Sequence, residues 1–265
     1  MKDSRVDFDV DIAAIGYPAV RNAFNETLQL CVEKLSKADL KLAEEILGLA
    51  ALDEVSPGEA EMLADAALYS CKGALGARAA TRRAIDRIAP KLPLKHDPLK
   101  SAIAARLPAA IFSVFAVERA HEQGGVVARD LLDDGRPIHI MDQALAAQAA
   151  VHGEFPIAGR FIDLGPWHIG FGIVLPLRKS EATAIRLALS DGKDTQYARA
   201  TLHELIYPAH LHGGDLVMTA LEPLITALAL AIDTDTIDMD DLAASLGSLL
   251  PGPPTPKHKR KPVSP

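Results

Sequence analysis

Three histidines near the carboxyl end of the chain have a spacing that suggests metal chemistry. His203 begins a sequence close to the H-E-x-x-H zinc motif, in which two imidazoles stand one helical turn apart. Tyr207 occupies the place of the second histidine, and Pro208 is expected to break the helix before His210 and His212. A metal-dependent enzyme that uses all three histidines is therefore one hypothesis. The simpler interpretation is a set of polar residues at a helix end, where histidine complements the helix dipole.

A group of aspartates between Asp233 and Asp241 raises the question of a calcium loop. An alignment that starts at Asp233 puts Asp238 where the loop requires glycine, and Ala244 where it requires a bidentate glutamate. The calcium pattern therefore fails. Capping of a helix by Asp238, with the following acids in its positively polarised first turn, explains much of the cluster.

A third group of chemically active residues belongs to segments that favour β-strands. In two of them a histidine alternates with isoleucines and therefore points away from the apolar face. If the two strands lie close together, these histidines share one surface with a tryptophan and a carboxylate, an arrangement suited to acid–base chemistry or to a polar ligand. Isolated polar side chains on the solvated face of a sheet are the alternative. The candidate pocket residues are His139, Asp163, Trp167 and His168, with Asp142 as the alternative carboxylate.

Basic residues concentrate on a helix predicted for residues 77–89. Arg78 and Arg82, like Arg83 and Arg87, are four residues apart, which stacks them on the helix surface. With the preceding helix they give a helix–turn–helix outline, in which arginines contact the phosphates or base edges of nucleic acid. The alternative is a solvated face paired with acidic neighbours. The net charge of −7 argues against broad nucleic-acid binding, and without the last fifteen residues the charge is −11.

Several common catalytic patterns are absent from the sequence. There is no G-x-S-x-G nucleophile elbow and no phosphate-binding loop, and Gly170-Phe171-Gly172 lacks the third glycine of a dinucleotide fingerprint. The two cysteines, Cys31 and Cys71, form neither a CxxC motif nor a disulfide framework. We therefore predict no cofactor, and a non-catalytic protein is favoured over an enzyme.

The elements that must position these residues fall into three zones. Residues 1–106 are expected to form a helical module. Its clearest start signal is Ser56-Pro57-Gly58-Glu59, in which the serine caps the helix, the proline occupies the first turn and the glutamate reaches back to the cap amide. Ser36, with Asp39 three residues later, predicts a second capped helix.

Residues 107–178 change from a helical to a strand pattern. Continuous apolar and alternating segments are separated by turn signals such as Gly124-Gly125 and Asp133-Asp134-Gly135. Gly170 and Gly172 lie on one strand face, which indicates bending or the close approach of another element. Short connections favour an antiparallel meander, either an open sheet or a small barrel. The predicted strands are 110–120, 125–132, 136–142, 157–164 and 168–176.

Residues 179–250 return to a helical pattern, with helices predicted at 179–190, 194–206, 215–232 and 239–249. The apolar run at 216–232 contains a glutamate and a proline and is flanked by aspartates, so we read it as a buried or partner-facing helix and not as a membrane span. Residues 251–265 are rich in proline and lysine and are expected to be a disordered tail. The charged amino terminus has no apolar signal-peptide core, which favours a cytoplasmic protein without membrane association.

The sequence as a whole predicts an α+β protein, with a helical N-terminal module, a central small antiparallel β-sheet or barrel of about five strands, and a C-terminal helical module. The favoured function is a cytoplasmic interaction or regulatory protein that binds a protein partner, or a second copy of itself, through helix faces. Nucleic-acid binding through the arginine helix and metal-dependent catalysis through the three histidines are the alternatives.

Overall fold

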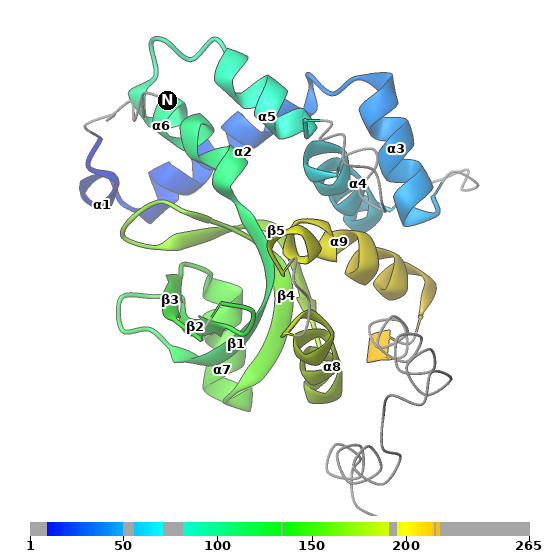
Figure 1. Ribbon diagram of the computed structural model, residues 1–265. Coiled ribbons are helices and arrows are strands. Elements are labelled where there is room, and N and C mark those ends of the chain that lie inside the picture. Colours follow the sequence, from blue (N-terminus) through cyan, green and yellow to red (C-terminus); the bar gives the residue numbers. More distant parts are fainter. Residues whose placement is uncertain are drawn as a thin grey trace, which may run out of the picture. The chain divides into compact units, whose positions relative to one another are not determined.

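The computed structural model describes residues 10–49, 56–70, 82–133, 135–190, 195–214 and 216–217 (Figure 1). The predicted α+β class with a sheet of about five strands is confirmed. The amino-terminal zone contains α1 (Ile12–Ile15), α2 (Tyr17–Val32), α3 (Lys37–Leu47), α4 (Pro57–Tyr69), α5 (Ala84–Ile88) and α6 (Pro98–Arg106), with short 3₁₀ turns at Ala89–Lys91 and Leu107–Ala109.

Two of these helices begin at the predicted capping signals. The Ser56 hydroxyl accepts from the Glu59 amide, while the Glu59 carboxylate accepts from the Ser56 amide at 2.7 Å. Ser36 and Asp39 form the same reciprocal pair at the start of α3. Each pair satisfies two amides that the first turn of a helix leaves without intrahelical partners. The sequence therefore predicts the starts of α3 and α4 correctly.

Five strands form a closed barrel in the order β1-β2-β3-β5-β4. The strands are β1 (Ile111–Ala120), β2 (Val126–Asp130), β3 (Pro137–Ile140), β4 (Phe155–Asp163) and β5 (His168–Pro176). Each overlaps one predicted strand. The order, with a helix between β3 and β4, is the connectivity of an OB-type Greek-key barrel.

The expected all-antiparallel meander is wrong in one respect. The helix α7 (Gln143–His152) separates β3 from β4 and lets β3 run parallel to β5, which it pairs through Ile140 and His168. Asp142 caps α7 by accepting from the Leu145 amide at 2.9 Å, and the alanine-rich segment that follows has high helix propensity. These signals were present, but the strand pattern on both sides obscured them.

The glycines of β5 act as their pattern predicts. The aromatic ring of Phe161 lies against Gly170, where an added Cβ would be 3.0 Å from a ring carbon, and it also lies against Gly159 of its own strand. The antiparallel register of β4 and β5 shifts between Gly159 and Phe161. Gly172 has a φ of 101°, a conformation that favours glycine. Gly170 therefore permits the close approach of the Phe161 ring, and Gly172 permits a bend in the strand.

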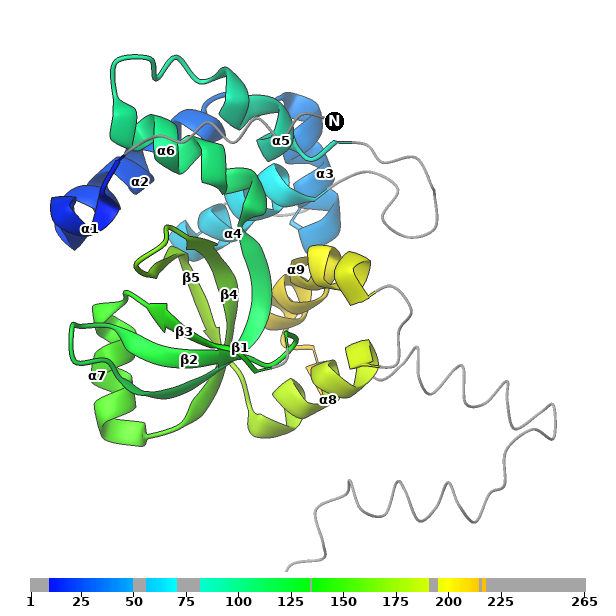
Figure 2. The ribbon, with the colours of Figure 1, turned by 60° about the vertical axis from the view of Figure 1, so that its left-hand side comes forward.

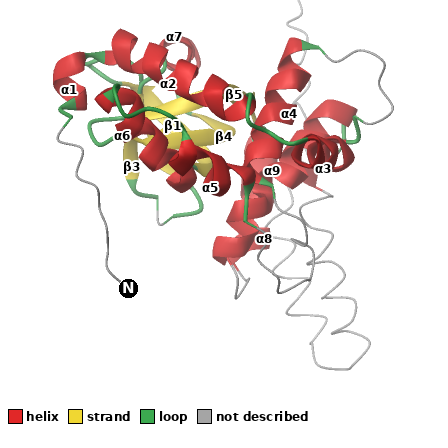
Figure 3. Cartoon of the chain, turned by 90° about the horizontal axis from the view of Figure 1, so that it is seen from above, coloured by secondary structure: helices red, strands yellow, loops and turns green. Residues whose placement is uncertain are grey.

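Helices pack on the barrel through three apolar clusters. The first joins α2, α5 and α6 to β5 and the end of β4, and Figure 3 shows these helices lying across the strands. The second joins α3, α4, α8 (Lys179–Ser190) and α9 (Thr195–His212) to β1, β4 and β5. The third packs α7 against the barrel strands (Figure 2). All described residues belong to one compact unit of the chain, Met1–Leu221.

Two predicted helix boundaries are wrong. Residues 82 and 83 are not helical, so the helix predicted over 77–89 is reduced to Ala84–Ile88 among the residues the structure describes. The helix α9 continues through Pro208 instead of breaking there. Ile206 and Tyr207 are fully buried beside this proline, and their packing offsets the cost of about 3 kcal/mol that a proline imposes on a helix interior. Among the described helices, none is long and apolar enough to cross a membrane.

Candidate functional site

A cavity of about 350 Å³ opens beside the barrel, where β3 approaches β4 and β5. Its volume falls within the range of small-molecule sites. The four residues of the pocket hypothesis, His139, Asp163, Trp167 and His168, all line this cavity. Asp142 does not line it, because its carboxylate caps α7. The remaining lining residues are Ala109, Ile111, Phe115, Asp130, Asp133, Arg136, Pro137, Ile138, Phe161, Gly165 and Pro166.

The turn between β4 and β5 brings three of these residues together. Asp163 and His168 are directly opposite each other in the antiparallel register of the two strands. The Asp163 carboxylate accepts from the amide of Gly165 at 2.7 Å, and the Leu164 amide donates to the carbonyl of Trp167 at 3.1 Å. The turn therefore fixes the carboxylate and holds the tryptophan ring at the cavity wall.

His168 has a perturbed acid–base equilibrium. Partial burial lowers the pKa of its imidazole below the ordinary value of 6.5, while the charge of Asp163 opposes this shift. The nearby charges of Arg136 and His139 add to the lowering. His168 is consequently neutral at pH 7 and adds no positive charge to the cavity.

His139 connects the cavity to the loop between β1 and β2. Its ring stacks on that of His121, with centroids 3.7 Å apart and planes 19° from parallel. Its Nε2 donates to the carbonyl of Gly124 at 2.7 Å, and the Gln123 amide donates to His121 Nδ1 at 3.1 Å. Desolvation, followed by the charges of His139 and Arg119, lowers the pKa of His121. The stack therefore disfavours a positive charge on His121.

The floor and walls of the cavity combine aromatic rings with carboxylates. Phe115 and Phe161 meet edge to face, with centroids 5.0 Å apart. Asp130 is buried and accepts from the Ser113 hydroxyl at 2.5 Å and from the Leu132 amide at 2.9 Å. Sequence reasoning did not single out these residues, because Phe115, Asp130 and Phe161 fall in the predicted strands 110–120, 125–132 and 157–164 without a motif of their own. Barrel closure, which no local pattern encodes, brings them to the same place.

The three histidines of the metal hypothesis lie on α9 but do not face a common point. His203 is buried and hydrogen-bonded through Nε2 to the Ser70 hydroxyl at 2.9 Å. His212 Nε2 donates to the carbonyl of Leu47, and His210 is exposed. Among the residues that the structure describes, no three histidine, cysteine or acidic side chains are grouped to hold a metal ion.

The arginines of the nucleic-acid hypothesis are partly occupied by ion pairs. Arg83 donates to both carboxylate oxygens of Asp86 and to the carbonyl of Pro108. Arg87 pairs with Asp39 at 2.7 Å. Arg78 lies outside the described residues, as do Cys71, the aspartates at 233–241, residues 218–232 of the apolar run and the basic tail.

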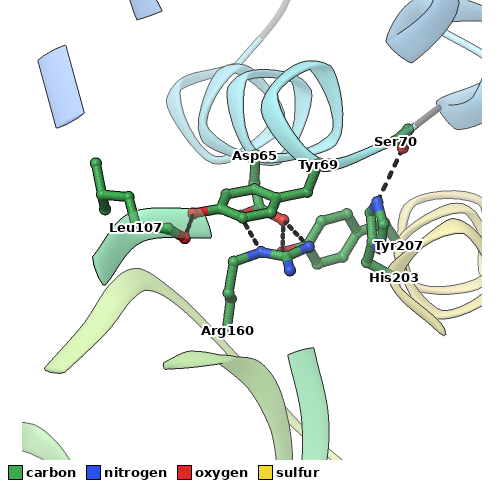
Figure 4. Close-up of polar contacts among 7 residues, drawn as sticks. All are labelled: Asp65, Tyr69, Ser70, Leu107, Arg160, His203 and Tyr207. Carbon is green, nitrogen blue, oxygen red and sulfur yellow. Dashed lines mark hydrogen bonds and ion pairs between the residues drawn. The ribbon is translucent and has the colours of Figure 1, made fainter. Parts of the chain in front are cut away.

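A buried polar network between α4, β4 and α9 is the other concentration of polar side chains (Figure 4). Arg160 donates to both oxygens of Asp65, and the Tyr207 hydroxyl donates to the same carboxylate at 2.9 Å. The guanidinium carbon lies 3.8 Å from the ring centroid of Tyr69, whose hydroxyl donates to the carbonyl of Leu107. These four side chains satisfy one another away from solvent, so their role is to hold the helices on the barrel.

The Ser70–His203 contact at the edge of this network has the residue types of a nucleophile and its base. Both side chains are buried, and neither lines a cavity among those found in the described part of the chain. Burial raises the pKa of the adjacent Glu204, and a hydrogen bond from Ser70 opposes this rise. A substrate carbonyl has no described path to the hydroxyl, so this pair is assigned to packing.

Comparison with known proteins gives no match: no family model, no curated protein and no solved structure matches this chain.

Proposed function

We propose that this protein is a non-catalytic binding module and that the cavity beside its barrel is the ligand site. The observation that carries the proposal is the convergence of His139, Asp163, Trp167 and His168, from three strands and a turn, on one cavity of ligand size. Barrels with this connectivity bind oligonucleotides and oligosaccharides on surfaces that include the loop between their fourth and fifth strands. That loop supplies Trp167 here.

Binding is favoured over catalysis because the cavity offers no activated nucleophile. His168 lies opposite Asp163 across the β4–β5 pair, and the ring of His139 is stacked on that of His121. Both histidines therefore already have partners within the protein. The earlier hypothesis of a partner bound through helix faces drew on residues 216–232. Only 216 and 217 of them are among the described residues, so the cavity is the better supported site.

Nucleic acid is the less suitable ligand for this barrel. Residues 107–178 contain five arginines, no lysine and eight carboxylates, a net charge of −3. Nucleic-acid binding depends on neutralising phosphates with basic side chains. An acidic barrel repels that polyanion, and the arginines at 83 and 87 are already paired with acids.

The intrinsic fluorescence of the protein tests the proposal, because Trp167 is its single tryptophan and lines the cavity. We expect saturable fluorescence changes with members of a small panel of ligands: butylammonium, butyrate, butanol and inorganic phosphate. Ala109→Phe places a ring in the cavity and should abolish the change, whereas Ala147→Phe on the exposed face of α7 should not. A protein whose emission responds to no member of the panel, or responds equally in both variants, contradicts the proposal.

A further inference from the structure

We infer that the cavity selects an organic cation, a ligand with an ammonium or guanidinium group. The inference rests on the proposed function, because it names the ligand class of the same cavity. Two independent features of the cavity support it: the charge of its polar lining and the aromatic character of its walls.

The polar lining carries more negative than positive charge. Asp130 at the end of β2, Asp133 in the following connection and Asp163 at the end of β4 supply three carboxylates. Arg136 is the one arginine or lysine among the lining residues. Because burial keeps His168 neutral at pH 7, it does not offset the excess. A cation entering the cavity is attracted by this charge, and an anion is repelled.

The aromatic lining favours an organic cation over a metal ion. Phe115, Phe161 and Trp167 border the cavity, and aromatic faces attract ammonium and guanidinium groups through their quadrupole. A metal ion requires several oxygen, nitrogen or sulfur ligands at close range. No group of three acidic, histidine or cysteine side chains within the described ranges provides them. The combination of rings and separated carboxylates fits an organic cation.

Asp163 is the carboxylate best placed to anchor the charged group. Its side chain is exposed, while the hydrogen bond from the Gly165 amide fixes its orientation. A fixed acceptor loses little conformational freedom when a ligand donates to it. The same turn holds Trp167, so the anchoring charge and one aromatic wall move as a unit.

Two sources carry this chemistry: an arginine or lysine side chain of a partner protein, and a free small amine. The two make different demands on the cavity mouth. A partner side chain is attached to a backbone, which must remain outside the cavity, whereas a free amine enters whole. A blocked peptide with a single arginine among glycines and serines therefore distinguishes them from methylguanidinium.

The test compares three four-carbon ligands of similar size by titration of the Trp167 fluorescence of the full chain: butylammonium, butyrate and butanol. We expect butylammonium to bind at least about tenfold more tightly than the other two, because a hydrogen bond to a charged group changes affinity by that order. Asp163→Asn keeps an oxygen acceptor for the Gly165 amide and should weaken butylammonium binding about tenfold. The matched control Asp142→Asn retains the cap of α7 and should leave binding unchanged.

The outcomes separate the inference from the proposed function. Equal or tighter binding of butyrate or butanol overturns the cation inference while the cavity remains a ligand site. A response to none of the three overturns the inference, and the absence of a response to inorganic phosphate as well overturns the proposed function. If Asp163→Asn does not weaken the binding of butylammonium, Asp163 is not the anchor and the inference is also overturned. Between the two sources, tighter binding of the arginine peptide than of methylguanidinium assigns a partner side chain, and the reverse assigns a free amine.

Discussion

Arg160 of β4 donates to both carboxylate oxygens of Asp65 of α4, at 2.7 and 3.1 Å, with each side chain only 3% exposed. The pair is the central contact of the network in Figure 4 and joins the barrel to the amino-terminal helices. Because water cannot replace a missing partner there, removal of one member leaves an uncompensated charge.

We therefore predict that Arg160→Met lowers the free energy of unfolding by about 3–5 kcal/mol. Arg178→Met breaks the ion pair with Glu181, in which the arginine is 67% exposed, and should cost less than about 1 kcal/mol. Chemical denaturation of both variants measures the difference. Similar losses in the two would show that the buried pair does not hold the layers together.

The loop between β1 and β2 depends on glycine at position 125. Its φ is 72°, and an added Cβ would collide with the carbonyl oxygen of Ile140. Gly125→Ala should therefore destabilise the protein by about 2–5 kcal/mol, from backbone strain and overpacking together. Gly58→Ala in α4, where an added Cβ meets no atom within 4 Å, should stabilise it by up to about 1 kcal/mol. We expect the temperature of thermal unfolding to fall for Gly125→Ala and to rise for Gly58→Ala. An unchanged unfolding temperature for Gly125→Ala would contradict the close approach of residue 125 to the Ile140 carbonyl.

The contact of Gly170 with Phe161 predicts energetic coupling across β4 and β5. Gly170→Ala should cost about 1–3 kcal/mol, because the new methyl group would press against the Phe161 ring and displace it. Phe161→Leu relieves the clash, so the double variant should be more stable than the sum of the single losses predicts. A double-mutant cycle measured by denaturation tests this, and additive losses would contradict the contact.

The sequence predicts where the five strands lie along the chain, but it does not predict which strands pair to close the barrel. Alternation and turn residues locate all five strands, and the glycine at 170 correctly signals close packing. The cavity depends on which strands become neighbours: His168 meets β3 through one parallel pair, and Asp130 reaches the same wall from β2. Such long-range pairings leave no local periodicity, so only half of the polar lining was foreseen. The predicted helix 77–89 is too long, because residues 82 and 83 are not helical and α5 begins at Ala84.

The pKa of His168 gives the protein a pH-dependent stability. Burial lowers this pKa below 6.5 in the folded state, so the unfolded chain binds more protons as the pH falls from 6.5. The contribution of neutral His168 to the free energy of unfolding is therefore fully present above pH 6.5. It is lost as the pH falls from 6.5 toward the lower pKa that His168 has in the folded protein. His168→Gln should reduce the loss measured by unfolding at pH 7.5 and 5.5, while His152→Gln at the exposed end of α7 should leave it unchanged. An identical pH response in both variants would exclude His168 as its source.

The most direct measurement of the central claim uses the indole N–H of Trp167, which gives a single side-chain signal in a proton–nitrogen NMR spectrum because the chain has one tryptophan. Butylammonium is titrated into the labelled full chain at pH 7.5 and, in parallel, into Ala109→Phe. A cation-binding site in the cavity predicts a saturable shift of this signal in the unaltered protein and none in the filled variant. A signal that stays in place up to saturating cation, or that shifts equally in the filled variant, contradicts the account.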